Sequence, residues 1–135
     1  ADAAGADAVV LARGSVDPTN PKVVRSTAGS LFHLPVISDL TLDEAVTALK
    51  AAGMSVLAAD GRGETGLYSA QANALLAAPT AWLLGNEARG FTPATLGAAD
   101  AVVSIPVYGE AESLNVATAA AICLYASARA HHAGE

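Results

Sequence analysis

Short apolar runs alternate along the chain with longer segments of helical character. The apolar runs are often bounded by Gly, Pro or Asp, a pattern that is typical of strands buried in a sheet. The predicted strands cover residues 7–12, 34–37, 55–59, 81–84 and 101–105. The predicted helices cover residues 21–32, 42–52, 70–78, 93–98 and 114–131.

The segment 42–52 shows the helical pattern most clearly. Thr41 can cap its amino-terminal end, and Gly53 follows its carboxyl-terminal end. Asp43 and Glu44 complement the helix dipole in the first turn. The apolar positions that share one face are Leu42, Ala45, Val46 and Leu49.

Strands that alternate with helices predict an α/β domain with a mainly parallel sheet and helices on both faces. In such sheets a ligand binds beyond the carboxyl ends of the strands. Gly85 follows one predicted strand and Ile105 ends another. Both positions are therefore expected to face one crevice.

The composition fits a single domain. The chain has 135 residues, of which 53% are hydrophobic, enough to bury a core without disulfides or metal. The one cysteine, Cys123, lies in an Ala-rich apolar run and is expected to be a buried thiol in the reducing cytoplasm. No Cys/His cluster has the spacing of a metal site, and no membrane segment is visible. His33, His131 and His132 are expected to be structural.

The net charge of −6 argues against a protein that grips nucleic acid over its whole surface, because phosphate neutralisation needs clustered Lys and Arg. Any RNA contact is therefore expected to be local, or to come from a second subunit or another part of the protein.

One segment matches the dinucleotide fingerprint G-x-G-x-x-G. It reads Gly-Arg-Gly-Glu-Thr-Gly at residues 61–66, follows a predicted strand, and has Glu87 about 20 residues further on. An NAD-type oxidoreductase domain is one interpretation. The other is a glycine-rich loop, because Glu64 would place a carboxylate beside a pyrophosphate and Tyr68 is bulky where a helix should start.

Two further stretches, taken together, indicate more about function than the amino-acid composition does. Residues 84–91 read Leu-Gly-Asn-Glu-Ala-Arg-Gly-Phe, and residues 113–117 read Ser-Leu-Asn-Val-Ala, with Ile105-Pro106 between them. In order and spacing they resemble the second and third motifs of the SpoU/TrmH family of RNA ribose methyltransferases. Residues 22–30 also look like the segment before the second helix of that family. The likeness covers nearly the whole chain.

The resemblance implies an S-adenosylmethionine (AdoMet)-dependent enzyme that methylates a ribose 2′-hydroxyl in rRNA or tRNA. It also implies a homodimer and a carboxyl-terminal trefoil knot of the SPOUT type. Family members carry an earlier, arginine-bearing motif before a segment like residues 1–7, so we expect residues 1–135 to be an N-terminally incomplete methyltransferase domain. A catalytically incomplete module for RNA binding or dimerisation is a further alternative.

The resemblance also assigns a cofactor pocket. The residues implied to line or flank it are Leu84, Gly85, Asn86, Gly90, Ile105, Pro106, Val107, Leu114 and Asn115. Backbone groups of Gly85, Ile105 and Leu114 would bind the cofactor, and apolar side chains would sandwich its adenine. Gly85 and Gly90 provide clearance for such backbone contacts.

Four residues are candidates for the active site. Asn115 and Ser113 could orient a ribose hydroxyl, although both types also suit the capping of the last helix. Glu87 could order the loop or the active-site network by accepting hydrogen bonds. Arg25 either binds a phosphate or the reacting ribose or is an ordinary arginine on a helix surface.

Overall fold

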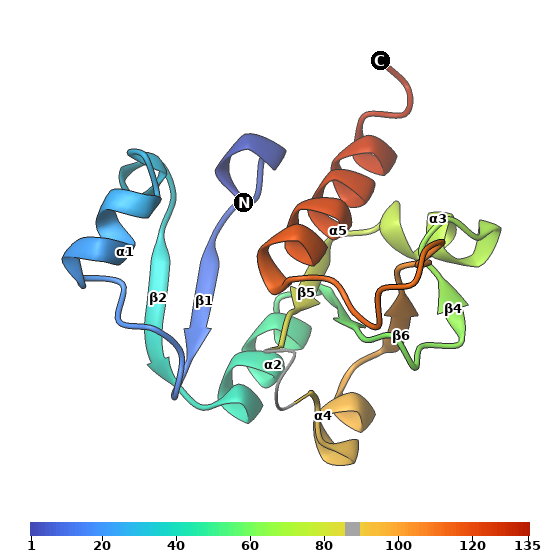
Figure 1. Cartoon of the computed structure of the whole chain (residues 1–135), viewed down its shortest axis with the longest axis horizontal. Coiled ribbons are helices and arrows are strands. Elements are labelled where there is room, and N and C mark those ends of the chain that lie inside the picture. Colours follow the sequence, from blue (N-terminus) through green and yellow to red (C-terminus); the bar gives the residue numbers. More distant parts are fainter. Residues whose placement is uncertain (86–89) are drawn as a thin grey trace.

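The strands form two parallel sheets in the computed structural model, which describes residues 1–85 and 90–135 (Figure 1). The strands are β1 Val9–Ala12, β2 Val36–Leu40, β3 Ser55–Ala59, β4 Thr65–Gly66, β5 Thr80–Leu83 and β6 Ala101–Ser104. The helices are α1 Pro21–Ser26, α2 Leu42–Ala51, α3 Ala70–Leu76, α4 Pro93–Ala98 and α5 Val116–His131, with 3-10 turns η1 Asp2–Ala4 and η2 Ser30–Phe32.

The strand order places the last strand inside the larger sheet. One sheet is β1-β2, and the other has the order β4-β6-β3-β5, with every neighbouring pair parallel. The predicted α/β class with parallel strands is confirmed. Strand β4 was not expected, because Thr65 and Gly66 form no apolar run and the strand is defined only by its pairing with β6.

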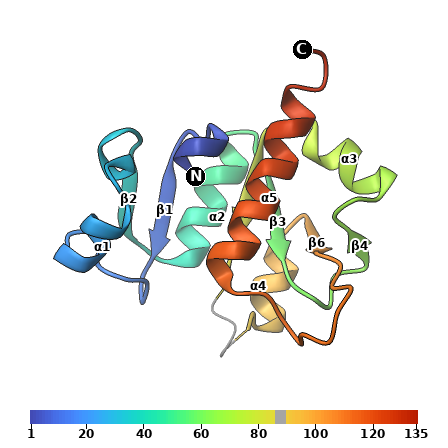
Figure 2. The same cartoon turned by 45° about the horizontal axis from the view of Figure 1, so that its top comes forward.

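Helices cover both faces of the larger sheet (Figures 1 and 2). Val56 and Ala58 of β3 are fully buried in a cluster that packs against residues of α2 and α4. Leu57, which points to the opposite face, is buried in a second cluster with residues of α3 and α5. The alternation of side chains along a strand thus builds two cores, one on each face.

Helix α2 is the helix that the sequence defines best. Thr41 Oγ1 accepts a hydrogen bond from the Glu44 backbone N–H at 3.1 Å, and Glu44 Oε2 accepts one from the Thr41 N–H at 2.8 Å. This capping box satisfies two backbone donors at the helix start. The hydrogen bonds from Thr41 also hold the pKa of the Glu44 carboxyl below its usual value.

The predicted helix over residues 21–32 is interrupted. Helix α1 ends at Ser26, and Ala28 and Gly29 then have positive φ angles of 50° and 92°. A left-handed backbone cannot continue a right-handed helix, so the chain reverses and resumes only as the short turn η2. The expectation of one continuous helix was wrong.

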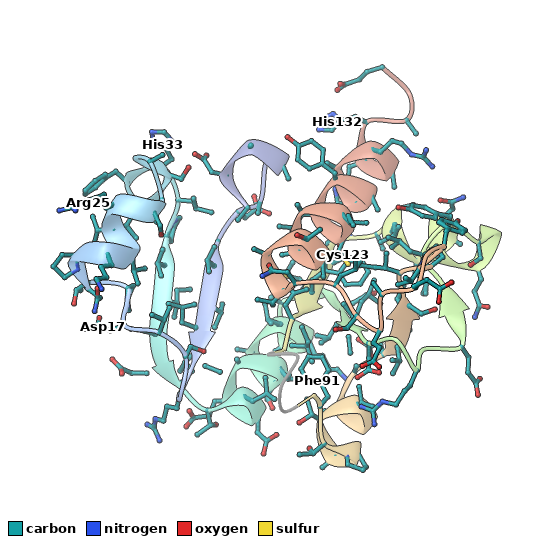
Figure 3. All side chains as sticks on the ribbon, in the orientation of Figure 1. Asp17, Arg25, His33, Phe91, Cys123 and His132 are labelled. Atoms are coloured by element: carbon teal, nitrogen blue, oxygen red, sulfur yellow. The ribbon has the colours of Figure 1, made fainter. Side chains whose placement is uncertain are left out.

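Helix α5 packs through a polar contact as well as apolar ones. Ser127 is 7% exposed, and its Oγ accepts a hydrogen bond from Trp82 Nε1 at 2.9 Å. Cys123 is fully buried on the same helix (Figure 3), and burial raises the pKa of its thiol to about 12. The expectation that Cys123 is a buried thiol is confirmed. Within the described ranges, no helix is both long and apolar enough to cross a membrane.

Asp100 joins the start of β6 to the centre of the larger sheet. Its Oδ2 accepts a hydrogen bond from the N–H of the fully buried Val56 at 2.8 Å, and its Oδ1 lies 3.2 Å from Lys50 Nζ. The bond from the Val56 N–H is the main reason that the pKa of Asp100 is below its usual value, and Lys50 adds to the effect.

We expect Asp100→Ala to destabilise the fold by about 1–3 kcal/mol, because the buried Val56 N–H loses its acceptor. Asp100→Asn, which keeps an acceptor oxygen, should lose less. Because folding lowers this pKa, the stabilisation is present above the unfolded value of about 3.9 and is lost as the pH falls through the folded value. Urea unfolding of the three proteins between pH 3 and pH 7 measures both effects. Equal stabilities at neutral pH would refute this role of Asp100.

Candidate functional site

A hollow of about 400 Å³ opens at the carboxyl ends of three parallel strands. Ala59 ends β3, Leu84 and Gly85 follow β5, and Ile105 follows β6. This is the edge at which a parallel α/β sheet is expected to bind its ligand. The amino-terminal end of α5 completes the wall with Val116 and Ala119.

The structure brings the two sequence motifs together at this hollow. The predicted pocket residues that line it are Leu84, Gly85, Gly90, Ile105, Val107 and Leu114, and Ser113 lines it as well. Pro106 and Asn115 each lie between two lining residues. Asn86 and Glu87 lie outside the described residues. The motifs are therefore neighbours in space although about twenty residues of chain separate them.

Gly85 is held close to an aromatic ring from its own loop. A Cβ on Gly85 would lie 3.0 Å from two ring carbons of Phe91, closer than most side chains approach. The Phe91 ring packs in turn against the core cluster around Val56 and Leu83. The lack of a side chain at Gly85 therefore lets the Phe91 ring approach its backbone closely.

Asn115 caps helix α5. Its Oδ1 accepts hydrogen bonds from the backbone N–H groups of Ala117 at 2.8 Å and Thr118 at 3.4 Å. Because the amide oxygen is used in this way, the Nδ2 group is the part of the side chain that remains for a ligand. The expected capping role is confirmed, and Ser113, two residues earlier, is an exposed residue at the wall of the hollow.

The hollow includes charged residues that the motifs did not indicate. Asp60 and Arg62, in the turn after β3, both line it and form an ion pair at 2.9 Å. The hydrogen bond from the Arg62 side chain is the main reason that the pKa of the Asp60 carboxyl is lowered. Glu112, next to Ser113, adds a second carboxylate. The sequence signal for this pair was the glycine-rich segment 61–66, which contains Arg62 and directly follows Asp60.

The dinucleotide interpretation of that segment does not fit its structure. The fingerprint requires its third glycine to open a helix, whereas Gly66 ends strand β4 and α3 begins only at Ala70. A Cβ on Gly63 would lie 2.7 Å from the carbonyl oxygen of Val102. This glycine is explained by its close approach to β6, not by a bound pyrophosphate.

Arg25 and the histidines lie apart from the hollow. Arg25, on α1, is far from Phe91 in Figure 3, on the outer side of the β1-β2 sheet. His33 contacts Asp2 at 2.6 Å, and His131 Nε2 lies 3.1 Å from the Ala78 carbonyl oxygen. These contacts agree with the structural roles expected for the histidines. In the part of the chain that the structure describes, no three His, Cys, Asp or Glu side chains gather as metal ligands.

Comparison with known protein families shows which family this chain belongs to. The model of the SpoU rRNA Methylase family matches residues 1–125. This chain belongs to the SpoU rRNA methylase family. The predicted resemblance is thereby confirmed.

Relatives within the SpoU family share the sequence over nearly the whole chain. The chain is 42% identical over 128 residues to the 23S rRNA (guanosine(2553)-2'-O)-methyltransferase RlmP of Bacillus subtilis, covering 93% of this chain and 48% of that protein. It is 37% identical over 139 residues to the 23S rRNA (uridine(2479)-2'-O)-methyltransferase of Streptomyces viridochromogenes, with coverages of 99% and 47%. The chain thus spans about half the length of the curated relatives that it matches.

A solved SpoU structure has the same fold. The SpoU methyltransferase AviRb from Streptomyces viridochromogenes, in complex with the cofactor AdoMet, superposes with a TM-score of 0.85 and 36% sequence identity. The match covers 98% of this chain and 53% of that one.

Proposed function

We propose that residues 1–135 belong to one methyltransferase domain, which binds AdoMet and transfers its methyl group to a ribose 2′-hydroxyl of RNA. The observation that carries the proposal is the meeting of both SpoU motifs at one hollow beyond β3, β5 and β6. The names of the two relatives, both 23S rRNA 2'-O-methyltransferases, favour rRNA over tRNA as the substrate.

The hollow suits AdoMet. Its volume of about 400 Å³ lies within the range of about 300–1,000 Å³ that is usual for pockets holding small ligands. Leu84, Ile105 and Leu114 supply apolar surface for an adenine ring, and the backbone at Gly85 can approach its edge. The AdoMet complex of AviRb, with the same fold, supports this choice of cofactor.

Bound AdoMet would supply an electrophilic methyl group, so the protein has mainly to align the donor and the acceptor. We assign the alignment of the ribose hydroxyl to Asn115 Nδ2 and the Ser113 hydroxyl. We assign to Glu87 the ordering of its loop through accepted hydrogen bonds. Asn86, Pro106 and Val107 would flank the cofactor.

The hydroxyl proton must also leave, and a cation near the developing alkoxide lowers the cost of its departure. We assign to Arg25 the binding of a phosphate or the reacting ribose. Because Arg25 lies apart from the hollow of its own chain, this role requires an RNA that spans both regions or a second subunit.

We also propose a homodimer and the trefoil knot of the family. A stripe of small and apolar residues begins just before α5 and continues along it with Leu114, Ala117, Ala121, Leu124 and Ala128. Ala117 and Ala121 are exposed, so small side chains would allow the helix of a second subunit to approach closely. A cytoplasmic location would agree with an rRNA substrate and with the lone buried thiol of Cys123.

Methyl transfer from tritiated AdoMet to rRNA tests the proposed activity. The full-length protein should label 23S rRNA, and nuclease digestion should release the label as a 2′-O-methylnucleoside. Label on a base would contradict the proposed chemistry. Tight AdoMet binding without any transfer would favour the alternative of a catalytically incomplete RNA-binding or dimerisation module.

A further inference from the structure

The turn after β3 is fixed to the backbone of β6. The Asp60 N–H donates to the carbonyl oxygen of Val103 at 3.0 Å, and the Gly63 N–H donates to the carbonyl oxygen of Asp60 at 3.0 Å. A Cβ on Gly63 would lie within 2.8 Å of the Ser104 nitrogen, so the turn could not approach β6 as closely with a larger residue. One wall of the hollow is therefore anchored to a central strand.

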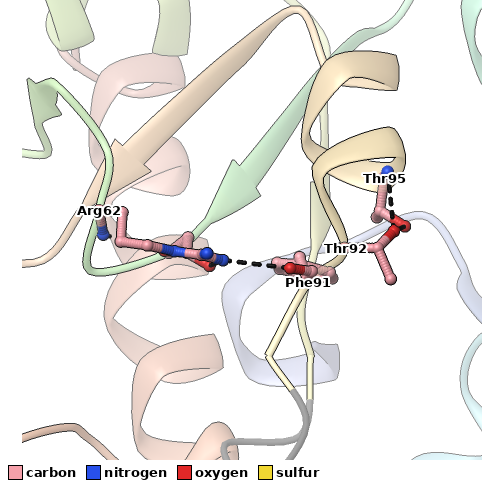
Figure 4. A network of polar contacts seen from close by, with 5 residues as sticks. Arg62, Phe91, Thr92 and Thr95 are labelled. Atoms are coloured by element: carbon pink, nitrogen blue, oxygen red, sulfur yellow. Dashed lines mark hydrogen bonds and ion pairs between the residues drawn. The ribbon is translucent and has the colours of Figure 1, made fainter.

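Arg62 spans from this turn to the loop that follows β5 (Figure 4). Its Nε donates to Asp60 Oδ1 and its Nη2 to Asp60 Oδ2, each at 2.9 Å. The same Nη2 donates to the carbonyl oxygen of Phe91 at 3.1 Å. The carboxylate is only 11% exposed, so the paired contact fixes the plane of the guanidinium and aims the second N–H of Nη2 at the carbonyl oxygen of Phe91.

The Phe91 end of the contact is anchored as well. Its ring packs against the buried cluster that includes Val56 and Leu83. The next residue, Thr92, caps α4 by accepting a hydrogen bond from the Thr95 N–H at 3.2 Å. Arg62 thus joins the turn at Asp60 to the segment Gly90–Phe91, and both are supported independently and line the hollow.

We propose that Arg62 is a positioning residue that holds the turn at Asp60 and the segment Gly90–Phe91 of the AdoMet pocket at their binding separation before the cofactor arrives. This inference rests on the proposed function. Ordering the loops on binding would cost affinity, and a loop already held in place avoids that cost. This role explains the residues of segment 61–66. Gly63 allows the turn to pack against β6, and Arg62 reaches across the pocket. Arg62 acts here through Asp60 and Phe91, not on the reacting atoms.

Calorimetric titration with AdoMet measures the effect of this contact. Arg62→Gln should weaken the affinity about tenfold, with a less favourable binding entropy, because the loops must then be ordered on binding. The midpoint of thermal unfolding should change little, since Arg62 is 62% exposed. Arg62→Lys should be intermediate, because an ammonium cannot make the paired contact and the Phe91 bond in the same planar geometry. Arg129→Gln, which removes an exposed arginine near the other end of α5, is the matched control and should bind like wild type.

Two further measurements separate positioning from a general loss of structure. Asp60→Asn should weaken binding as Arg62→Gln does, and the double variant should be hardly weaker than either alone, because both changes break one unit. In the ligand-free protein, the Gly63 amide should exchange its hydrogen faster in Arg62→Gln than in wild type. If Arg62 had a purely structural role, Arg62→Gln would lower the unfolding midpoint. Its AdoMet affinity, measured at a temperature well below that midpoint, would equal that of wild type.

The outcomes distinguish this inference from the proposed function. If wild type and Arg62→Gln bind AdoMet equally well, the positioning role is overturned and the proposed function stands. If the AdoMet affinities are equal but Arg62→Gln binds RNA more weakly than wild type, Arg62 contacts the RNA instead. If wild type binds no AdoMet, the proposed function fails, and the role of Arg62 in cofactor binding fails with it.

Discussion

Gly85→Val should abolish measurable AdoMet binding, with a loss of affinity of about 100-fold or more, while the domain stays folded. A Cβ at this position would lie 3.0 Å from the Phe91 ring, and the two methyl groups of valine would need the same space. Either the ring moves out of its packing or the loop moves into the hollow. Overpacking of this kind costs about 1–3 kcal/mol of stability, which a domain of this size should survive.

Calorimetry with AdoMet and S-adenosylhomocysteine, at a temperature well below the unfolding midpoint of the variant, measures the loss of affinity. Gly97→Ala is the matched control, because Gly97 lies in α4 with no atom within 4 Å of its added Cβ. That variant should bind AdoMet like wild type. Unchanged affinity in Gly85→Val would mean that the cofactor pocket lies elsewhere.

Asn115→Asp should separate the capping role of Asn115 from its assigned role in the reaction. Aspartate also caps helices well, so the bonds from Ala117 and Thr118 should persist and stability should be retained. The Nδ2 donor is lost, however, and a carboxylate would face the ribose hydroxyl. We expect methyl transfer at saturating AdoMet to fall by about 100-fold, comparable to the loss of one positioned donor in a transition state.

Asn115→Ala completes the comparison, because it removes the cap as well as the amide. It should lose about 1 kcal/mol of stability in addition to the activity. Thermal unfolding together with single-turnover methyl transfer resolves the two effects. Full activity in Asn115→Asp would show that Asn115 serves only as the helix cap.

The sequence was most informative where local chemistry sets the structure. The capping residues Thr41 and Glu44 defined the start of α2, and the apolar runs located β3, β5 and β6 to within a few residues. The carboxyl ends of those strands then predicted the position of the hollow. The spacing of the two SpoU motifs indicated the family, which no single residue among them could have done.

Features that depend on distant contacts were not predictable in the same way. Strand β4 exists only through its pairing with β6, and the break after Ser26 reflects the positive φ angles of Ala28 and Gly29. The bond from Arg62 to Phe91 joins residues 29 positions apart. No pattern in the neighbourhood of Arg62 encodes the position of Phe91, because their proximity depends on the order of β3, β5 and β6 in the sheet.

In our proposal the hollow beyond β3, β5 and β6 binds AdoMet. Titration of the full-length protein with AdoMet and, in parallel, with NAD tests it most directly. We expect one AdoMet bound per chain, displaced by S-adenosylhomocysteine and lost in Gly85→Val, with no heat from NAD. The absence of AdoMet binding, or selective binding of NAD, would contradict it.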